Sequence, residues 1–317
     1  MSASASGPAP QSAALLPDLP VIGLMVVLCA SWGLQQVAIK IAMVDIPPLT
    51  QLALRCGGGI LLVYAWSLWR GVALFQRDRS LVPGLLSGGF FATEFVILYL
   101  ALEHTAASRV TLFLYTAPFF VALGALVFLP GERLRPLQWL GVVFSFTGVA
   151  VAMGAPPPEA DWTSGLADAG CVLAGALWAG QTLTIRKSVL KTVPFEKVLL
   201  YQLTMSLLFA VVFAVVRGEE LRWPVSGTSI FWLLYQIVWV VAVTYLIWFK
   251  LLSRYAAGPL QAATAMSPMF GIAAGVLVLG EAFTPGFGMA TVLIVIGLVL
   301  VNYRRRRPLP DGGIRPT

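Results

Sequence analysis

Two charged side chains, Arg55 and Glu94, lie inside apolar stretches of the sequence. If those stretches span a membrane, such groups are costly and usually face a partner or a polar cavity. Arg55 follows Pro48 by seven residues and Glu94 precedes Glu103 by nine, so their depths match at roughly 10 and 13 Å. They could form a structural ion pair, hold the carboxylate and ammonium of a substrate, or make no contact. The sequence leaves these three interpretations open.

Aromatic and amide side chains form a second set of candidates. Trp32 and Gln35 share one face of a helix, and Trp178 and Gln181 share the equivalent face of another. Rings this far from a helix end are poorly placed as interface anchors, so they either pack in the core or line a cavity. The candidate substrate-binding residues are Trp32, Gln35, Arg55, Glu94, Tyr99, Tyr115, Trp178, Gln181, Trp239, Tyr245 and Trp248.

Two prolines near the middle of apolar segments, Pro118 and Pro268, are hinge candidates, since proline removes a backbone hydrogen bond and permits a kink. A tolerated packing kink is the alternative. Arg109 lies about 200° around the helix from Thr111, away from the candidate cavity face. We therefore expect Arg109 to extend toward solvent at the outer end of its helix.

Several kinds of catalytic chemistry find no support in the sequence. There is no glycine-rich phosphate loop and no nucleophile elbow, and His104 is the only histidine. The three cysteines have no metal-ligand spacing, and an odd number at membrane depth argues against a disulfide framework. We predict no catalytic residues, no metal and no cofactor, although a membrane-embedded enzyme and a channel remain less favoured alternatives.

The elements that position these residues are long apolar segments. The chain is 58% hydrophobic and 11% charged, whereas soluble domains carry about 25% charged residues. A spanning helix needs roughly 20 apolar residues, and backbone groups in lipid must pair within each segment. We predict an all-α membrane protein with ten transmembrane helices, at about 20–43, 49–70, 81–103, 105–129, 136–154, 165–186, 195–217, 228–252, 257–280 and 285–303.

The two halves of the chain resemble each other. SWGLQQVAIK in the first half aligns with LWAGQTLTIR in the second, which places Trp32 on Trp178 and Gln35 on Gln181. Pro118 likewise aligns with Pro268. Each copy holds five segments, an odd number, so the second copy must be inverted. The sequence therefore predicts two inverted five-helix repeats around a central cavity, an architecture of secondary transporters.

The distribution of basic residues predicts the orientation. Cytoplasmic loops collect Lys and Arg, and basic residues here follow every second segment and fill the C-terminal tail. We expect both termini in the cytoplasm, and the net charge of +7 then needs no nucleic-acid partner. The predicted domains are a disordered tail (1–19), a first repeat (20–154), an extracytoplasmic linker (155–164), a second repeat (165–304) and a basic cytoplasmic tail (305–317).

The Trp-Gly pair before Lys40, the spacing from Pro48 to Arg55, and Pro118 followed by Glu132 resemble the EamA repeat of the drug/metabolite transporter superfamily. The resemblance covers both copies, about residues 20–154 and 165–304. It implies a cavity lined by the first four helices of each repeat, with helices 136–154 and 285–303 peripheral. The aromatic amino-acid exporters (the YddG-like branch) are one branch to which the chain could be similar, but no residue singles that branch out.

The resemblance implies a bacterial inner-membrane secondary transporter that exports small organic metabolites by alternating access. Amino acids, aromatic ones included, or related compounds are the expected substrates, and a multidrug or cation exporter of the same fold is the alternative. Expected partners are a small-molecule substrate and membrane lipids. We expect a monomer; a dimer contact through the small-residue stripes of helices 136–154 and 285–303 is the alternative.

Overall fold

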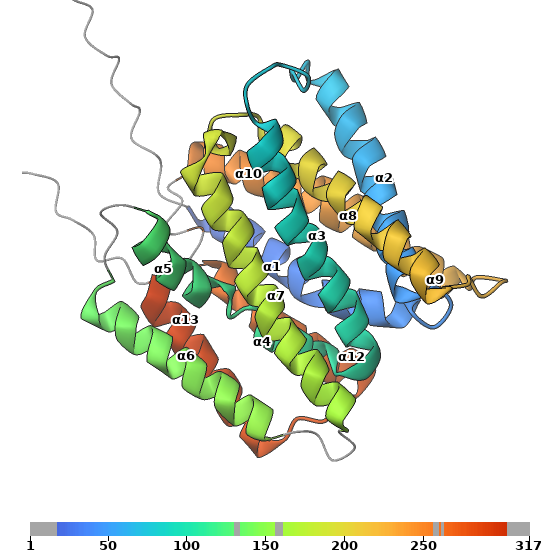
Figure 1. Cartoon of the computed structure of the whole chain (residues 1–317). Coiled ribbons are helices and arrows are strands. Elements are labelled where there is room, and N and C mark those ends of the chain that lie inside the picture. The colour runs from blue at the N-terminus through green and yellow to red at the C-terminus, as the bar shows by residue number, and fades with distance from the viewer. Residues whose placement is uncertain (1–17, 130–133, 156–160, 256–259, 261–262, 303–317) are drawn as a thin grey trace, which may run out of the picture.

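A computed structural model of the chain describes residues 18–129, 134–155, 161–255, 260 and 263–302. The described residues form helices, turns and loops and no strand. The predicted terminal tails, up to residue 17 and from residue 305, lie outside the described residues, as do positions 156–160 of the predicted linker. Figure 1 shows the helices gathered into one bundle.

Helices begin where the sequence supplies caps or prolines. Asp18 accepts the first N–H bond of α1 from Val21 at 3.2 Å, and prolines open α2 and α6, where a missing N–H costs nothing. The helices of the first half are α1 (Leu19–Ala42), α2 (Pro48–Trp69), α3 (Leu81–His104), α4 (Ala107–Leu114), α5 (Ala117–Phe128) and α6 (Pro136–Gly154).

The second half contains more irregular helix. Gly218 ends α8 with a left-handed φ of 63°, which glycine adopts without strain. The elements are α7 (Trp162–Lys187), η1 (Val189–Lys191), α8 (Phe195–Arg217), α9 (Gly227–Leu234), the π-helical η2 (Tyr235–Thr244), α10 (Tyr245–Arg254), the 3₁₀ turn η3 (Thr264–Met266), α12 (Ser267–Leu279) and α13 (Pro285–Asn302).

Seven helical stretches among the described residues are long and apolar enough to cross a membrane, counting α4 with α5, and α9 with η2 and the start of α10. Two apolar stretches are shorter, Thr264–Leu279 and Pro285–Val301. α7 has 26 residues but is not among the seven stretches, because it carries several polar residues, including Asp168 and Gln181. Each of the ten predicted segments overlaps one or more of these helices, and the segment 105–129 is interrupted by a turn between α4 and α5. That all ten span the membrane stays a prediction.

Helix packing joins the two halves. α6 packs against α13, α2 against α8, and α4 against α12; each of these pairs joins elements that the sequence repeat equates. α1 also packs on α12 just as α7 packs on α5. At the α1–α12 crossing, a Cβ added to Gly33 would lie 2.5 Å from the backbone nitrogen of Gly271. Only glycine permits this approach, because the two backbones are in contact.

The small-residue stripes of the two peripheral helices face each other. A Cβ on Gly141 would lie 2.8 Å from the carbonyl oxygen of Gly297, and one on Gly148 would lie 2.9 Å from that of Ala290. These stripes let helices approach closely, and here they do so within one chain. Within the chain, each stripe covers the other. A monomer stays a prediction.

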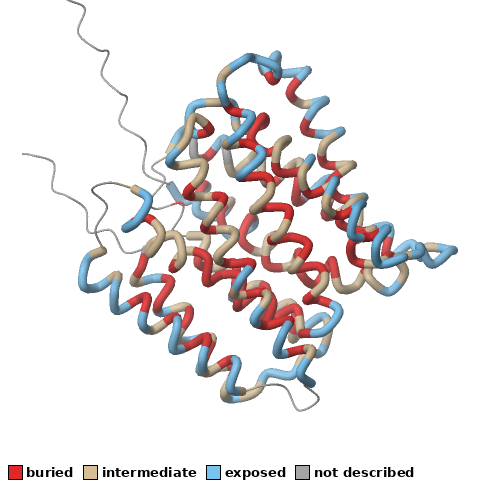
Figure 2. The backbone as a smooth tube through the Cα atoms, viewed as in Figure 1, coloured by how far each residue is buried: buried red, intermediate tan, exposed pale blue. Residues whose placement is uncertain are grey.

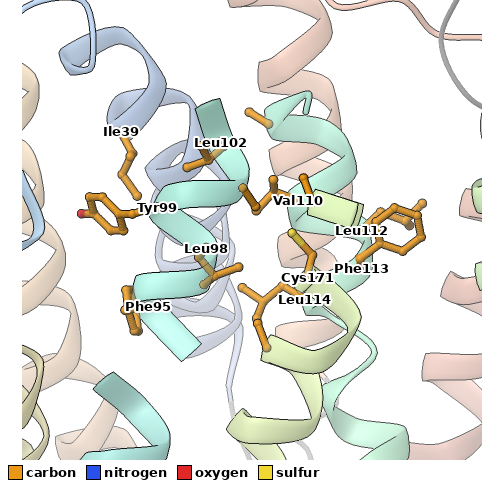
Figure 3. Close-up of a cluster of buried hydrophobic side chains, with 14 of the residues drawn as sticks. Ile39, Phe95, Leu98, Tyr99, Leu102, Val110, Leu112, Phe113, Leu114 and Cys171 are labelled. Atoms are coloured by element: carbon orange, nitrogen blue, oxygen red, sulfur yellow. The ribbon is translucent and has the colours of Figure 1, made fainter. Parts of the chain in front are cut away.

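Burial concentrates between the helices and exposure on the outside of the bundle, as Figure 2 shows. One buried cluster joins the C-terminal half of α3 and α4 with α7 (Figure 3). Leu98, Leu102, Val110 and Leu114 take part in it, together with Cys171. This apolar layer separates the middle of the bundle from the end at which α1 and α3 finish.

Candidate functional site

A cavity of about 320 Å³ lies in the middle of the bundle. Its walls come from both halves of the chain, from α1, α3, α4, α7, α8 and α10. Eight of the eleven predicted site residues line it, namely Trp32, Gln35, Glu94, Tyr115, Trp178, Gln181, Tyr245 and Trp248. A volume of this size is at the lower end of the range for small-molecule sites.

Two aromatic pairs belong to the lining. Trp32 meets Trp248 edge-on with ring centroids 5.6 Å apart, and Tyr115 meets Trp178 in the same way at 5.5 Å. The indole of Trp32 also donates to the Thr244 hydroxyl at 2.9 Å. Edge-to-face contacts and this bond fix the rings in place. Each pair contains one of the two tryptophans that the repeat equates.

A chain of amides ends on the carboxyl group of Glu94. Gln202 donates to the amide oxygen of Gln181 at 2.7 Å, and Gln181 donates in turn to Glu94 Oε2 at 2.7 Å. Gln202 also lies 3.4 Å from the Ser87 hydroxyl. Every bond of the chain therefore points its donor toward Glu94. The second carboxyl oxygen of Glu94 has no hydrogen bond among the described residues and remains able to accept one from a ligand.

Arg55 lies behind the cavity wall. It is fully buried, its guanidinium carbon sits 4.5 Å from the ring centre of Phe95, and Nη2 donates weakly to Gln35 Oε1 at 3.5 Å. Nε and Nη1 have no hydrogen-bond partner among the described residues. The described ion pairs do not join Arg55 to Glu94, so the structural-pair interpretation is wrong: Arg55 bonds to Gln35 and Glu94 to Gln181.

Two further predicted site residues lie outside the lining. Tyr99 is fully buried and donates to Gln236 Oε1 at 2.7 Å, which ties α3 to η2. Trp239 is 37% exposed on the outside of the bundle and donates to the Ser31 hydroxyl at 2.8 Å. Trp239 lies in η2, whose π-helical turns contain more residues than an α turn. The face of this residue therefore could not be extrapolated with the α period.

The two hinge candidates mark breaks in the helices. Pro118 lies in the first turn of α5, and the α4 helix ends just before it at Leu114. Pro268 opens α12, after the 3₁₀ turn η3. Residues beside both breaks, Leu114, Tyr115 and Thr264, line the cavity. The kinks thus sit where a bend would change the shape of the cavity, and their role as hinges stays a prediction.

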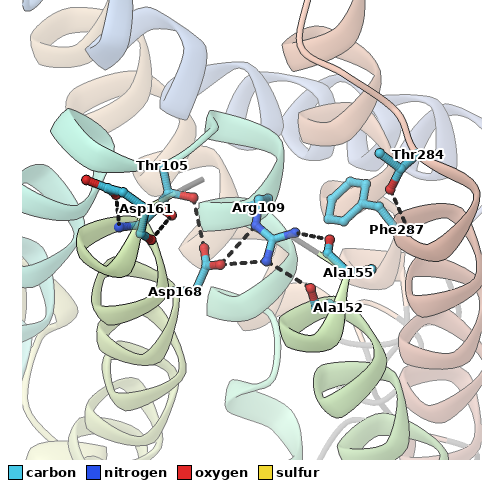
Figure 4. A network of polar contacts seen from close by, with 9 residues as sticks. Thr105, Arg109, Ala152, Ala155, Asp161, Asp168, Thr284 and Phe287 are labelled. Carbon is cyan, nitrogen blue, oxygen red and sulfur yellow. Dashed lines mark hydrogen bonds and ion pairs between the residues drawn. The ribbon is translucent and has the colours of Figure 1, made fainter. Parts of the chain in front are cut away.

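A buried ion pair joins α4 to α7 near the start of α7 (Figure 4). Arg109 Nη2 lies 2.5 Å from Asp168 Oδ2 and also donates to the Ala152 carbonyl at 2.9 Å, while Nη1 donates to Ala155 at 3.2 Å. Thr105 donates to the other oxygen of Asp168 at 2.8 Å. The expectation that Arg109 extends toward solvent is wrong, since the α6 carbonyls and Asp168 satisfy it inside the bundle.

A second polar group reinforces the same end. Glu281 accepts from the backbone N–H groups of Ala107 and Ser108 at 2.6 and 2.9 Å, which caps the start of α4. Lys40 lies 3.9 Å from Glu281 and donates to the Thr105 carbonyl at 2.7 Å. These contacts tie α1, α4 and the end of α12 together. The apolar cluster of α3, α4 and α7 and these polar contacts lie at the same end of the bundle.

Loop carboxylates connect the halves outside the helices. Asp78 accepts from Lys197 at 2.8 Å and from Ser80, and these bonds, that of Lys197 foremost, lower its pKa to about 2. Asp45 accepts from the hydroxyls of Ser226 and Ser229, and the Ser226 bond above all lowers its pKa. Both contacts fix a loop of the first half against a helix of the second.

Sequence reasoning missed two residues of these networks, Gln202 and Asp168. Both are polar groups inside apolar segments, and the criterion that selected Glu94 would have selected them as well. Gln202 lies seven residues inside α8 and Asp168 six residues inside α7. The signal was present, but their partners lie far away in the sequence, so their roles could not be assigned.

A model of the EamA-like transporter family matches residues 19–154 and, a second time, residues 165–303. An uncharacterized transporter of Archaeoglobus fulgidus is 25% identical over 241 residues, which cover 75% of this chain and 82% of that protein. The uncharacterized transporter YoaV of Bacillus subtilis is 25% identical over 250 residues, covering 76% of this chain and 82% of the relative.

More distant similarity extends to a human protein and to a solved structure. Solute carrier family 35 member G1 of Homo sapiens is 23% identical over 175 residues, which cover 53% of this chain and 48% of that protein. One crystal structure of 24% sequence identity superposes with a TM-score of 0.62 and covers 88% of this chain and 96% of its own. It shares the fold of the chain.

Proposed function

The chain belongs to the EamA-like transporter family and is therefore a multi-pass membrane protein, of the inner membrane in bacteria. For this transporter we propose a substrate class and a transport mechanism. It exports small organic metabolites, amino acids or closely related compounds, by alternating access. The cavity supports this proposal because it places the carboxyl group of Glu94 and the amide of Gln35 among aromatic side chains.

The proposal rests on the hydrogen-bond directions of the two repeat-related glutamines, Gln35 and Gln181: one accepts and the other donates. Gln35 accepts from Arg55, so its own amide N–H groups, which have no partner among the described residues, are available to donate to a ligand carboxylate. Gln181 instead donates to Glu94, whose second oxygen is available to accept from a ligand ammonium. A zwitterion would bind both groups, its carboxylate to Gln35 and its ammonium to Glu94. Hydrogen bonds to charged groups contribute about 1.5–3 kcal/mol each.

The aromatic pairs favour substrates with an apolar side chain. Trp32 with Trp248, and Tyr115 with Trp178, present ring faces and edges to the cavity. Aromatic surfaces of this kind contribute burial and edge-to-face contacts to a bound ring. Aromatic amino acids are therefore the first members of the substrate class to be tested. A multidrug or cation exporter is the second candidate, favoured by aromatic walls beside a single carboxyl group.

We take the structure as the starting state of transport, with the cavity closed toward the end that contains the Arg109–Asp168 pair. The Arg109–Asp168 and Lys40–Glu281 contacts lie on the predicted outer side, beyond Leu98 and its apolar neighbours. In this state substrate enters from the predicted cytoplasmic side. Export then requires the polar layer to separate while the opposite end closes, with bending at the helix breaks beside the cavity.

Transport by the purified chain in proteoliposomes tests the substrate class. The assay compares phenylalanine with phenylethylamine, which lacks the carboxylate, and with phenylpropionate, which lacks the ammonium. We expect exchange of radiolabelled phenylalanine to be inhibited by unlabelled phenylalanine at least tenfold better than by either analogue. Equal inhibition by phenylethylamine would instead select the cation exporter, and inhibition by none of the three would reject both candidates.

A further inference from the structure

A second pocket lies away from the transport cavity, at the end of the bundle where α2 finishes and α8 begins. It has a volume of about 520 Å³. Its mouth carries Arg70 from the end of α2 and Lys250 and Arg254 from α10, with Glu196 as its one acidic residue. The lining thus has a formal excess of two positive charges. Its other lining residues are Trp66, Phe195, Leu246 and Ile247.

The pocket combines this positive mouth with an apolar wall that continues onto the lipid-facing surface. Trp66 and Trp69 meet at a tilt of 58° with ring centroids 5.1 Å apart, and the guanidinium of Arg70 lies 5.8 Å from the Trp66 ring. Leu68 and Trp69, on the last turn of the same helix, are exposed by 61% and 75%. Tryptophans and arginines at a helix end are typical of the headgroup level of a bilayer.

We propose that this pocket binds an anionic phospholipid, whose phosphate lies among Arg70, Lys250 and Arg254 and whose acyl chains lie along Trp66 and the exposed apolar residues of α2. Charge complementarity identifies the headgroup as anionic, because a zwitterionic headgroup would bring its own cation into the mouth. The apolar wall identifies a lipid as the source of the phosphate, since a soluble anion would leave that wall uncovered.

The position of the pocket gives the lipid a structural consequence. α10 also carries Tyr245 and Trp248, which line the transport cavity, while α2 carries Arg55 behind the cavity wall. A lipid bridging the ends of these two helices would hold α10, a wall of the substrate site, against α2, which lies behind that wall. Basic pockets between membrane helices at the predicted cytoplasmic side are suited to anionic headgroups.

The test is lipid binding by the full chain in detergent, measured by native mass spectrometry with phosphatidylglycerol and phosphatidylcholine of identical acyl chains. The variant Arg70→Gln/Arg254→Gln removes two cations of the mouth. The control Arg77→Gln/Arg135→Gln removes two exposed cations outside the pocket. A cation near an anionic lipid contributes about fivefold in affinity. We expect roughly 25-fold weaker binding of phosphatidylglycerol to the pocket variant and unchanged binding to the control.

Three results would overturn the proposal. Equal weakening in both variants would indicate diffuse attraction without a site. Phosphatidylcholine binding as tightly as phosphatidylglycerol would remove the role of the cations. Glycerol phosphate displacing the bound lipid at equal concentration would indicate a site for a soluble anion.

Photo-crosslinking of the unaltered chain keeps the test valid if the pocket variant does not fold. Phosphatidylglycerol with a diazirine in one acyl chain should label peptides at the end of α2 and in α10, the latter including Leu246. Labelling spread evenly over all lipid-facing helices would contradict a defined site.

Discussion

Neutralising Asp168 tests whether the buried ion pair with Arg109 stabilises this end of the bundle. Asp168 and Arg109 are each only 4% exposed, and their charged atoms lie 2.5 Å apart. The variant Asp168→Asn leaves Arg109 buried without its counter-charge. Removal of one partner of a buried pair destabilises proteins by about 3–5 kcal/mol. Asparagine retains an oxygen for the Thr105 hydroxyl, so we expect the lower end of this range.

The variant Arg109→Met should be more destabilising than Asp168→Asn. It removes the same ion pair and also the donors to the Ala152 and Ala155 carbonyls at the end of α6. Each lost hydrogen bond adds about 0.5–1.5 kcal/mol. The double variant Arg109→Met/Asp168→Asn should recover the charge contribution and keep the carbonyl contribution, so it should be more stable than Arg109→Met alone.

The assay is unfolding of the purified chain in detergent, followed for the two single variants, the double variant and a control. The control is Arg217→Gln, which breaks a pair with Glu103 at 3.0 Å whose arginine is 41% exposed; exposed pairs contribute only about 0–1 kcal/mol. If Asp168→Asn changed stability no more than the control, or if the double variant lost the sum of both single losses, the buried pair would not stabilise this end of the bundle.

Two further predictions concern packing and pH. Gly33→Ala should destabilise the chain by about 1–3 kcal/mol, because the new Cβ would meet the Gly271 backbone. The control Gly23→Ala, whose Cβ would have nothing within 4 Å, should be neutral or slightly stabilising. Equal melting temperatures for the two variants would contradict the α1–α12 crossing. Asp78→Asn should lower the melting temperature at pH 7 and 5, and the difference from the unaltered chain should shrink as pH falls from about 4 to about 2. The reason is that the pKa of Asp78 is lowered from 3.8 to about 2 and that the bond from Lys197 is lost on protonation. A difference in melting temperature that stayed constant down to pH 2 would contradict this.

Much of the fold could be predicted from the sequence, because helices in lipid must satisfy their own backbone groups and reveal themselves by apolar length. The predicted segment 136–154 coincides with α6, and 195–217 coincides with α8. The breaks were less predictable in detail. Pro118 indicated a kink, but α4 ends at Leu114, the residue whose carbonyl would have bonded to the missing proline N–H.

The sequence predicted which helix faces line the candidate site, but it did not predict which side chains bond to each other there. Trp32, Gln35 and their repeat equivalents line one cavity, since helical periodicity fixes which residues share a face. The partner of Arg55 could not be read from matching depth, because depth says nothing of the direction in which a side chain points. Trp239 was misplaced because no sequence pattern indicated the π-helical stretch around it.

The most direct test of the substrate site is ligand binding to the variant Glu94→Gln. Glutamine can still accept the bond from Gln181, so the variant should fold with an unchanged melting temperature. We predict that its affinity for phenylalanine falls about 10- to 150-fold, the value of a hydrogen bond to a charged group, while its affinity for phenylpropionate, which has no ammonium, changes less than twofold. Equal losses for both ligands, or no loss for phenylalanine, would contradict a zwitterion held between Gln35 and Glu94.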